Sequence, residues 1–168
     1  VILGGTGPVG VASAVICAKA GANVTLVGRS LEKAEKIAGI CNDRYDSKNV
    51  KGGADADKSD FFNVADIVLN TGAAGIQLMN EEHIKNSNTL KICADTNAVP
   101  PSGIAGVDVM DNGKVIDMSP SKCLGIGALA IGNIKYKSQH ECLKLMYTSE
   151  KPVYLDFEDA FKFAQKSV

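Results

Sequence analysis

Three glycines near the start of the chain are spaced as in sites that bind phosphate groups. They belong to the pattern G-x-G-x-x-G, which here comprises Gly5, Thr6, Gly7, Pro8, Val9 and Gly10. In such a strand–turn–helix setting the first glycine permits a tight turn, the second lets the backbone approach a pyrophosphate, and the third allows close helix–strand packing. The unpaired amides and the positive end of the helix dipole then face the phosphates. These six residues predict a dinucleotide site, with a structural turn or a single-phosphate turn as the alternatives.

The residues after the second predicted strand indicate which dinucleotide is bound. About twenty residues beyond the glycines, enzymes that use NAD carry Asp or Glu for the ribose 2′-hydroxyl. This chain instead has Gly28, Arg29 and Ser30, followed one turn later by Lys33. A guanidinium can pair with a 2′-phosphate and lie flat against adenine, and Ser30 can add a further donor. We therefore predict NADP as the cofactor, bound in part by these four residues; the alternative is that Arg29 is only a solvated residue at a strand end.

Two loops after later strands are expected to line the nicotinamide side, because ligands sit beyond the carboxyl ends of parallel strands. The first loop contains Thr71, Gly72 and Ala73, which are small enough to let a cofactor pass close to the backbone. The second contains Asp95 and Asn97, polar residues at a strand end. All five are predicted to bind the cofactor. For Asp95 and Asn97 an equally weighted alternative is that their side chains bond the backbone of the turn that follows.

The elements that must position these residues alternate between strands and helices. Strands are predicted at residues 1–3, 24–27, near 50, 65–70 and 90–94, and helices at residues 9–20, from 30, from 58 and from 80. Gly21 is expected to end the first helix and Ser30 to cap the second. Strands alternating with helices at this spacing predict a parallel sheet with right-handed crossovers. The fold class is therefore α/β, a doubly wound parallel-sheet domain of the Rossmann type.

The last third of the chain is predicted to be helical. Gly125, Ala128 and Gly132 would share one face of a helix that another backbone can approach closely, and Lys135 extends from that same face. The apolar residues at 142, 143, 145 and 146 are expected in the core. Asp156 is expected to begin a closing amphipathic helix.

These elements suggest two parts. Residues 1–124 are predicted to form an NADP-binding Rossmann domain, and residues 125–168 to form closing helices. Because the chain begins at Val1, already inside a strand, we expect the closing helices to pack toward an amino-terminal substrate domain that this chain lacks.

The composition limits the class of protein. The chain has 168 residues, 45% of them hydrophobic, and a net charge of −1, which suits one domain with a core and argues against a nucleic-acid partner. No apolar run approaches the ~20 residues of a membrane helix. Five scattered cysteines without a C-x-x-C pair predict free thiols in a reducing cytoplasm, and the two histidines lack partners at metal-ligand spacing. We expect a cytoplasmic protein without a metal site.

The motifs taken together resemble those of one enzyme family. GTGPVG, VTLVGRSLEKA, NTGAAG, ADTNAVPPSGIAGVD and GIGALAIGNIK occur in order across nearly the whole chain. In this combination the chain resembles the NADP-dependent methylenetetrahydromethanopterin dehydrogenases, and it corresponds to their carboxyl-terminal, cofactor-binding part. The resemblance implies an oxidoreductase that transfers hydride from the one-carbon bridge of methylene-tetrahydromethanopterin, or of methylene-tetrahydrofolate, to NADP and leaves the methenyl form. It also implies that the full-length protein forms homo-oligomers.

The same resemblance assigns the catalytic position to Lys135. This residue matches the lysine of the family's G-x-[LI]-K segment, which implies that it orients the substrate through a hydrogen bond to the pterin ring. The family's Gly-Gly before this segment is Gly132-Asn133 here, a departure that could change the shape of the cleft. A strong acid or base is not required, because the product cation is shared between two nitrogens and positioning is the main task.

Two other functions stay open at the level of sequence. Another two-domain NADP dehydrogenase of shikimate-dehydrogenase-like build would explain GTGPVG and VGRS but not NAVPPSGIAGVD. A non-enzymatic NADP-binding module would need no substrate domain at all. Whether NAD is also accepted is likewise open. We expect the chain on its own to be inactive, because a pterin held between two domains would lose half its contacts.

Overall fold

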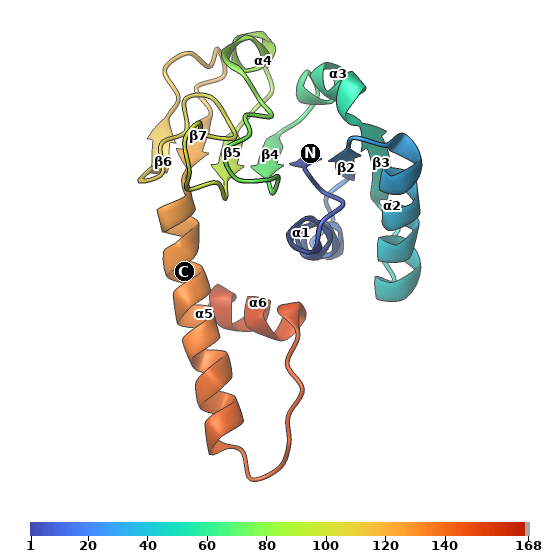
Figure 1. The fold of residues 1–168 in the computed structure, drawn as a ribbon, viewed down its shortest axis with the longest axis vertical. Coiled ribbons are helices and arrows are strands. Elements are labelled where there is room, and N and C mark those ends of the chain that lie inside the picture. The colour runs from blue at the N-terminus through green and yellow to red at the C-terminus, as the bar shows by residue number, and fades with distance from the viewer. Residues whose placement is uncertain (167–168) are drawn as a thin grey trace.

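The computed structural model describes residues 1–166, which form one seven-stranded sheet with helices on both faces (Figure 1). In chain order the elements are β1 (Ile2–Leu3), α1 (Pro8–Lys19), β2 (Val24–Gly28), α2 (Leu31–Tyr45), β3 (Val50–Ala54), the 3-10 turn η1 (Asp55–Asp57), α3 (Lys58–Phe62), β4 (Ile67–Asn70), α4 (Glu81–Asn86), β5 (Ile92–Asp95), β6 (Asn112–Val115), β7 (Leu124–Ile126), α5 (Ala128–Thr148) and α6 (Phe157–Gln165). The strand order across the sheet is β3-β2-β1-β4-β5-β7-β6.

All neighbouring strands are parallel except β6, which pairs antiparallel with β7. The order reverses direction between β1 and β4, so the carboxyl ends of these two strands form the switch point where such sheets bind ligands. This arrangement confirms the predicted doubly wound α/β fold of the Rossmann type.

Each face of the sheet has its own hydrophobic core. On one face α1 and α2 bury Ala14, Val15, Ala38 and Cys41 together with Leu26 of the sheet. On the other face α3 and α4 cover a second cluster, in which the largest fully buried side chains are Phe62, Leu3, Met79, Ile84, Leu90 and Ile104. Figure 1 shows α3 and α4 above the sheet and α1 below it.

Local signals in the sequence set the helix ends as predicted. Gly21, at a φ of 92°, follows the last turn of α1. The Ser30 hydroxyl accepts a hydrogen bond from the Lys33 amide at 3.3 Å and caps α2. The Asp156 carboxylate accepts hydrogen bonds from two amides of the first turn and caps α6. These caps satisfy amides that have no partner inside the helix.

The prediction that Gly125 shares a helix face with Ala128 and Gly132 is wrong. Gly125 lies in β7, paired in register with Cys93, and α5 begins only at Ala128. The sheet therefore continues to Ile126, two residues past the predicted domain boundary at 124. A short apolar run cannot be assigned to strand or helix by periodicity alone, which is why the glycine spacing suggested a helix here. Strand β6 was not predicted either.

Helix α5 is more exposed than its apolar residues suggested. Leu143 is 65% exposed and Met146 is 52% exposed, so the prediction that they lie in the core is wrong. Ser138 is the one buried residue of α5. Figure 1 shows α5 extending away from the sheet, with α6 returning alongside it and beneath α1. Within residues 1–166, α6 is the element that packs against α5, and Leu143 and Met146 stay exposed beside it.

Contacts between α6 and the first two helices hold the end of the chain against the α1–α2 core. Phe157 packs against that core, and its ring meets the ring of Tyr45 edge to face at a centroid distance of 5.5 Å. Glu158 forms an ion pair with Lys19 at the end of α1. No helix within residues 1–166 is long and apolar enough to cross a membrane.

Candidate functional site

The glycine-rich turn packs against itself and against the loop that follows β4. Gly4 has a φ of 63°, and a Cβ there would lie 2.5 Å from the Cα of Gly72, so the turn requires glycine at position 4. The sequence interpretation had given the tight turn to Gly5. A Cβ on Gly10 would lie 2.5 Å from the Cα of Gly5, so the third glycine of the pattern lets the start of α1 pack closely on the turn that follows β1.

Gly7 has a different reason to lack a side chain. Its φ is −86°. The nearest atom to an added Cβ would be the Gly4 carbonyl oxygen, at 3.8 Å. Neither backbone strain nor internal packing therefore calls for glycine at this position. What an added methyl group would occupy is the space outside the turn, where a pyrophosphate would approach.

The start of α1 offers amides without partners. Pro8 has no N–H, and the helix has neither a side-chain cap nor an acidic residue in its first turn. The first amide to bond within the helix is that of Val11, which donates to the Gly7 carbonyl at 2.9 Å. The amides of Val9 and Gly10 donate no hydrogen bond within residues 1–166, and Val9 is 57% exposed. An anion here would meet two free N–H groups and the positive end of a twelve-residue helix.

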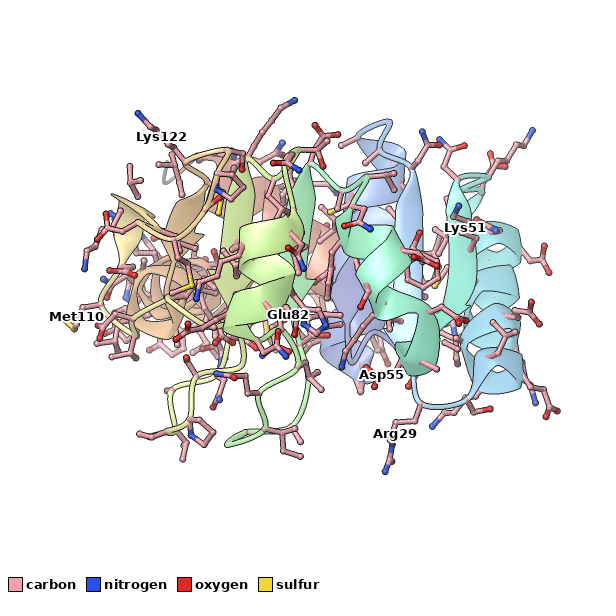
Figure 2. All side chains as sticks on the ribbon, turned by 90° about the horizontal axis from the view of Figure 1, so that it is seen from above. Arg29, Lys51, Asp55, Glu82, Met110 and Lys122 are labelled. Carbon is pink, nitrogen blue, oxygen red and sulfur yellow. The ribbon has the colours of Figure 1, made fainter. Side chains whose placement is uncertain are left out.

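Arg29 lies at the same edge of the sheet, immediately past β2. It is exposed, and Figure 2 shows its side chain pointing away from the ribbon into open space. No hydrogen bond or ion pair engages the guanidinium in the described part of the chain. The glycine turn is close by, because its Gly5 amide donates to the Val27 carbonyl at 3.0 Å and a Cβ on Gly28 would meet the Thr6 methyl at 2.8 Å. The turn and the arginine are thus parts of one surface.

Ser30 and Lys33 have fixed backbones next to Arg29. The Ser30 oxygen is used as an acceptor for the Lys33 amide, which leaves its hydroxyl hydrogen free to donate. Lys33 is exposed, one turn into α2. The four predicted residues 28–30 and 33 therefore form one short segment at the edge of the sheet.

The sequence interpretation missed a charged pair at this edge. Gly28 pairs with Ala54 in register, so Asp55 follows β3 at the same level as Arg29 follows β2. The Lys58 ammonium donates to both carboxylate oxygens of Asp55, at 3.1 and 3.3 Å. Figure 2 shows Arg29 and Asp55 at the same edge. The rule that ligands gather at the carboxyl ends of strands could have found this pair, had the end of the third strand been located.

Asp95 and Asn97 are engaged in bonds within the protein. Asp95 is 2% exposed, and its carboxylate accepts four hydrogen bonds, from the Asn70 side chain and from the amides of Asn97, Gly103 and Ile104. Asn97 accepts from two loop amides and donates to the Pro101 carbonyl at 2.8 Å. This geometry favours the alternative interpretation, that the two side chains hold the loop. Thr71 likewise donates its hydroxyl to the Leu3 carbonyl at 2.9 Å.

Lys135 lies two turns into α5 and is exposed. Its ammonium forms no hydrogen bond or ion pair with any residue from 1 to 166. No bond within that range connects Lys135 with the glycine turn or with the loops after β4 and β5. The residues predicted to bind the cofactor therefore lie at one edge of the sheet, whereas no bond within residues 1–166 joins Lys135 to them.

The described residues contain no cluster of three or more His, Cys, Asp or Glu side chains that could hold a metal ion. The five cysteines are free; Cys41, Cys93 and Cys123 are buried, and Cys17 and Cys142 are partly buried. The sulfurs of Cys93 and Cys123 lie 3.9 Å apart between β5 and the start of β7.

Comparison with known proteins gives a consistent result. No protein-family model matches the chain. Over 167 residues, 98% of its length, the chain is 39% identical to an NAD(P)-dependent methylenetetrahydromethanopterin dehydrogenase of Methylorubrum extorquens, of which it covers 56%. It is 37% identical over 149 residues to the bifunctional protein MdtA of the same organism, covering 87% of this chain and 50% of that protein. The chain thus spans about half the length of the curated relatives it matches.

A solved structure supports the fold independently. The quinate dehydrogenase of Corynebacterium glutamicum in complex with NAD superposes with a TM-score of 0.59 at 16% identity, over 99% of this chain and 54% of that one. At this identity the likeness concerns the fold alone, and it agrees with the Rossmann-type sheet. The sequence comparison goes further: over nearly its whole length the chain is similar to an NAD(P)-dependent methylenetetrahydromethanopterin dehydrogenase, in agreement with the resemblance of its motifs.

Proposed function

We propose that this chain is the cofactor-binding part of a dehydrogenase that oxidises the one-carbon bridge of methylene-tetrahydromethanopterin, or of its folate counterpart, with NADP as the hydride acceptor. The observation that carries the proposal is the placement, at one edge of the sheet, of an uncapped helix start and an unpaired arginine. The name of the relative supplies the substrate class, and the cofactor named there is NAD or NADP.

Two groups of residues at the edge of the sheet would each bind one part of the cofactor. The amides of Val9 and Gly10, with the open side of Gly7, would hold the pyrophosphate. Arg29, with Ser30 and Lys33 beside it, would hold the 2′-phosphate. The loops after β4 and β5 would flank the nicotinamide, and Thr71, Gly72 and Ala73 would contact it.

The chain's contribution to the reaction would be positioning. The nicotinamide, when bound, supplies the hydride acceptor. The protein has to bring the donor carbon of the substrate to the correct face of that ring and to exclude water, tasks that need no acid or base. Lys135 would hydrogen-bond the pterin ring and so orient it. A cation next to a cationic product is unfavourable, which argues against direct stabilisation of that product by Lys135.

We further propose that the closing helices, residues 127–166 of the predicted 125–168, pack against a substrate-binding region of the full-length protein; residues 167–168 lie outside the described residues. Two observations support this: α5 exposes Leu143 and Met146, and the chain spans about half of its relatives. Large exposed apolar residues on one helix are typical of surfaces that another part of a protein covers. A homo-oligomeric state and a cytoplasmic location of the full-length protein belong to the same proposal.

The test is a hydride-transfer assay with the full natural protein. Methylene-tetrahydromethanopterin and NADP are mixed with it, and the absorbance of reduced nicotinamide is followed. The proposal requires a rise with NADP, and methylene-tetrahydrofolate in a parallel assay identifies the carrier. Tight binding of NADP without any rise for either pterin would refute the reaction and leave another NADP dehydrogenase or a binding module.

The role of Lys135 is tested in the same protein. We expect Lys135→Ala to lower turnover while leaving the affinity for NADP unchanged, because Lys135 has no bond to the cofactor side. Lys137→Ala is the matched control, since it removes the same charge two residues away on α5 and should leave turnover unchanged. Loss of NADP affinity in Lys135→Ala with normal turnover of the bound complex would contradict the assignment.

A further inference from the structure

We infer that Asp95 is a positioning residue, which sets the nicotinamide half of the cofactor site without touching the cofactor. The inference rests on the proposed function. Asp95 is the last residue of β5, at the carboxyl edge of the sheet, and is 2% exposed. A side chain so deeply buried cannot be a direct ligand, and its function has to be carried by the groups it binds.

The carboxylate of Asp95 collects donors from two loops. One oxygen accepts from the Asn70 side-chain amide at 2.7 Å and from the Asn97 amide at 2.9 Å. The other accepts from the amides of Gly103 at 2.7 Å and Ile104 at 3.1 Å. Both oxygens are therefore fully used. One donor lies at the end of β4, just before the first loop, and the other three lie at the two ends of the second loop, which follows β5.

Asn70 carries the connection to the loop after β4. It is completely buried, and its side-chain oxygen accepts from the Gly72 amide at 3.0 Å while its nitrogen binds Asp95. Gly72 in turn lies against Gly4 of the glycine turn, where an added Cβ would come within 2.5 Å. The chain of contacts from Gly4 through Gly72 and Asn70 to Asp95 links the pyrophosphate side of the site with the nicotinamide side.

A second connection closes the network. The Asn97 side-chain oxygen accepts from the Gly75 amide at 3.2 Å, which ties the far end of the first loop to the start of the second. A Cβ on Gly103 would lie within 3.0 Å of both Asn70 and Asp95, so the three residues fit together without spare room. Figure 2 shows the two loops extending beyond the sheet on the same side as Arg29.

The cost in free energy of burying this carboxylate indicates that Asp95 does more than stabilise a local turn. Asp95 forms no ion pair with any residue from 1 to 166. A buried carboxylate without a cation is unfavourable unless hydrogen bonds replace its hydration, and all of its donors here serve the two loops. The network therefore fixes the position of one loop relative to the other, which is the geometry that hydride transfer depends on.

The test separates the two halves of the cofactor in the full natural protein. Binding of NADP and of adenosine 2′,5′-bisphosphate, which contains only the adenine half, is measured by calorimetry for the wild type and for Asp95→Asn. Asn keeps the shape but presents an N–H₂ group to one set of donors. We expect NADP binding to weaken about tenfold or more, the scale of a buried group left without its partner. The affinity for the adenine half should change by less than about twofold, because Asp95 is distant from the groups that would bind it. Both affinities are calculated from the concentration of folded protein.

Asp111→Asn is the matched control. Asp111 is also buried and its carboxylate accepts the Asp108 amide at 2.8 Å, but it lies outside the two loops. It should leave both affinities unchanged. If Asp95→Asn does not fold, Asn70→Ala takes its place, because Asn70 is completely buried and cannot touch a ligand itself.

Three outcomes decide the question. Selective loss of NADP affinity supports the positioning role. Equal loss for both ligands, or no loss for either, overturns it and leaves Asp95 with a purely structural role. A wild-type protein that binds neither ligand refutes the proposed function instead, so the two failures are distinguishable.

Discussion

The guanidinium of Arg29 is the charge on which the choice of cofactor would depend under the proposed function. It extends from the carboxyl edge of β2 with no partner among residues 1–166, next to the glycine turn. We expect Arg29→Ala to weaken NADP binding by about 1.5–3 kcal/mol, the scale of a hydrogen bond to a charged group, and to leave NAD binding nearly unchanged. Calorimetric titration of the variant with each cofactor measures both values.

A control variant distinguishes this local pairing from general electrostatic attraction. Lys48→Ala removes one positive charge just before β3, at the opposite end of the parallel strands. It should leave the affinity for NADP within a few tenths of a kcal/mol of the wild type, because exposed charges at such distances are screened. Equal weakening of NADP and NAD by Arg29→Ala would contradict the assignment to the 2′-phosphate.

Among the elements, the glycine turn and α1 show how close packing restricts one residue type. A Cβ on Gly10 would overlap the backbone of Gly5, whereas Gly39, inside α2, has open space in the same direction. Gly10→Ala should therefore destabilise the chain by about 1–3 kcal/mol through overpacking. Gly39→Ala should stabilise it by about 0.5–1 kcal/mol, since alanine favours the helix. Urea unfolding of both variants is the measurement; a tolerated Gly10→Ala would show that the turn has room to move.

Helix α4 contains a group whose protonation should affect stability. The Asn80 amide donates to Nδ1 of His83 at 3.1 Å, and the Asn80 side chain accepts from the His83 amide, so the pair forms a capping box. Burial lowers the pKa of His83 from its usual 6.5, and the Lys58 ammonium lowers it further. Since the folded protein binds the proton less tightly than the unfolded chain, this contribution to stability is present above pH 6.5 and is lost as the pH falls through the lowered pKa.

His83→Gln tests that contribution, because glutamine can occupy the same position of a capping box without titrating. The free energy of unfolding, measured in urea at about pH 7 and about pH 5, should fall less with acidification in the variant than in the wild type. An identical decrease in both proteins would mean that other groups carry the pH dependence.

For the whole molecule, the sequence predicted those parts of the structure in which short sequence motifs and the overall fold favour the same conformation. The glycine turn, the buried strands and the segment at Arg29 follow from short motifs and alternation, so the Rossmann topology could be predicted. Gly125 could not be placed, because a three-residue strand and a helix face look alike in sequence. The four bonds of Asp95 were missed for a different reason: they depend on which loops meet, and the sequence could only state two alternatives for that residue.

The last element, α6, depends on contacts with the opposite end of the chain. Phe157 packs on the α1–α2 core and against the ring of Tyr45, and it lies in the same cluster as Cys17. Because Phe157 is only partly buried, we expect Phe157→Ala to cost about 1–2 kcal/mol, less than a fully buried phenylalanine. Tyr154→Ala is the control, since that side chain is 99% exposed and should have no measurable effect in urea unfolding.

Alkylation of Cys17, which packs against the same α1–α2 core as Phe157, gives a second, local measure of whether that core opens. Burial raises the pKa of the Cys17 thiol above its usual value, which keeps it protonated and slow to react. If loss of the Phe157 ring loosens this core, Cys17 becomes more accessible and its pKa returns toward the ordinary value, so its alkylation at neutral pH should accelerate. A variant that loses stability without faster alkylation of Cys17 would show that the core around α1 stays closed and that the loss comes from the missing ring alone. Unchanged stability together with unchanged alkylation would show that the ion pair between Lys19 and Glu158 is sufficient to hold the helix.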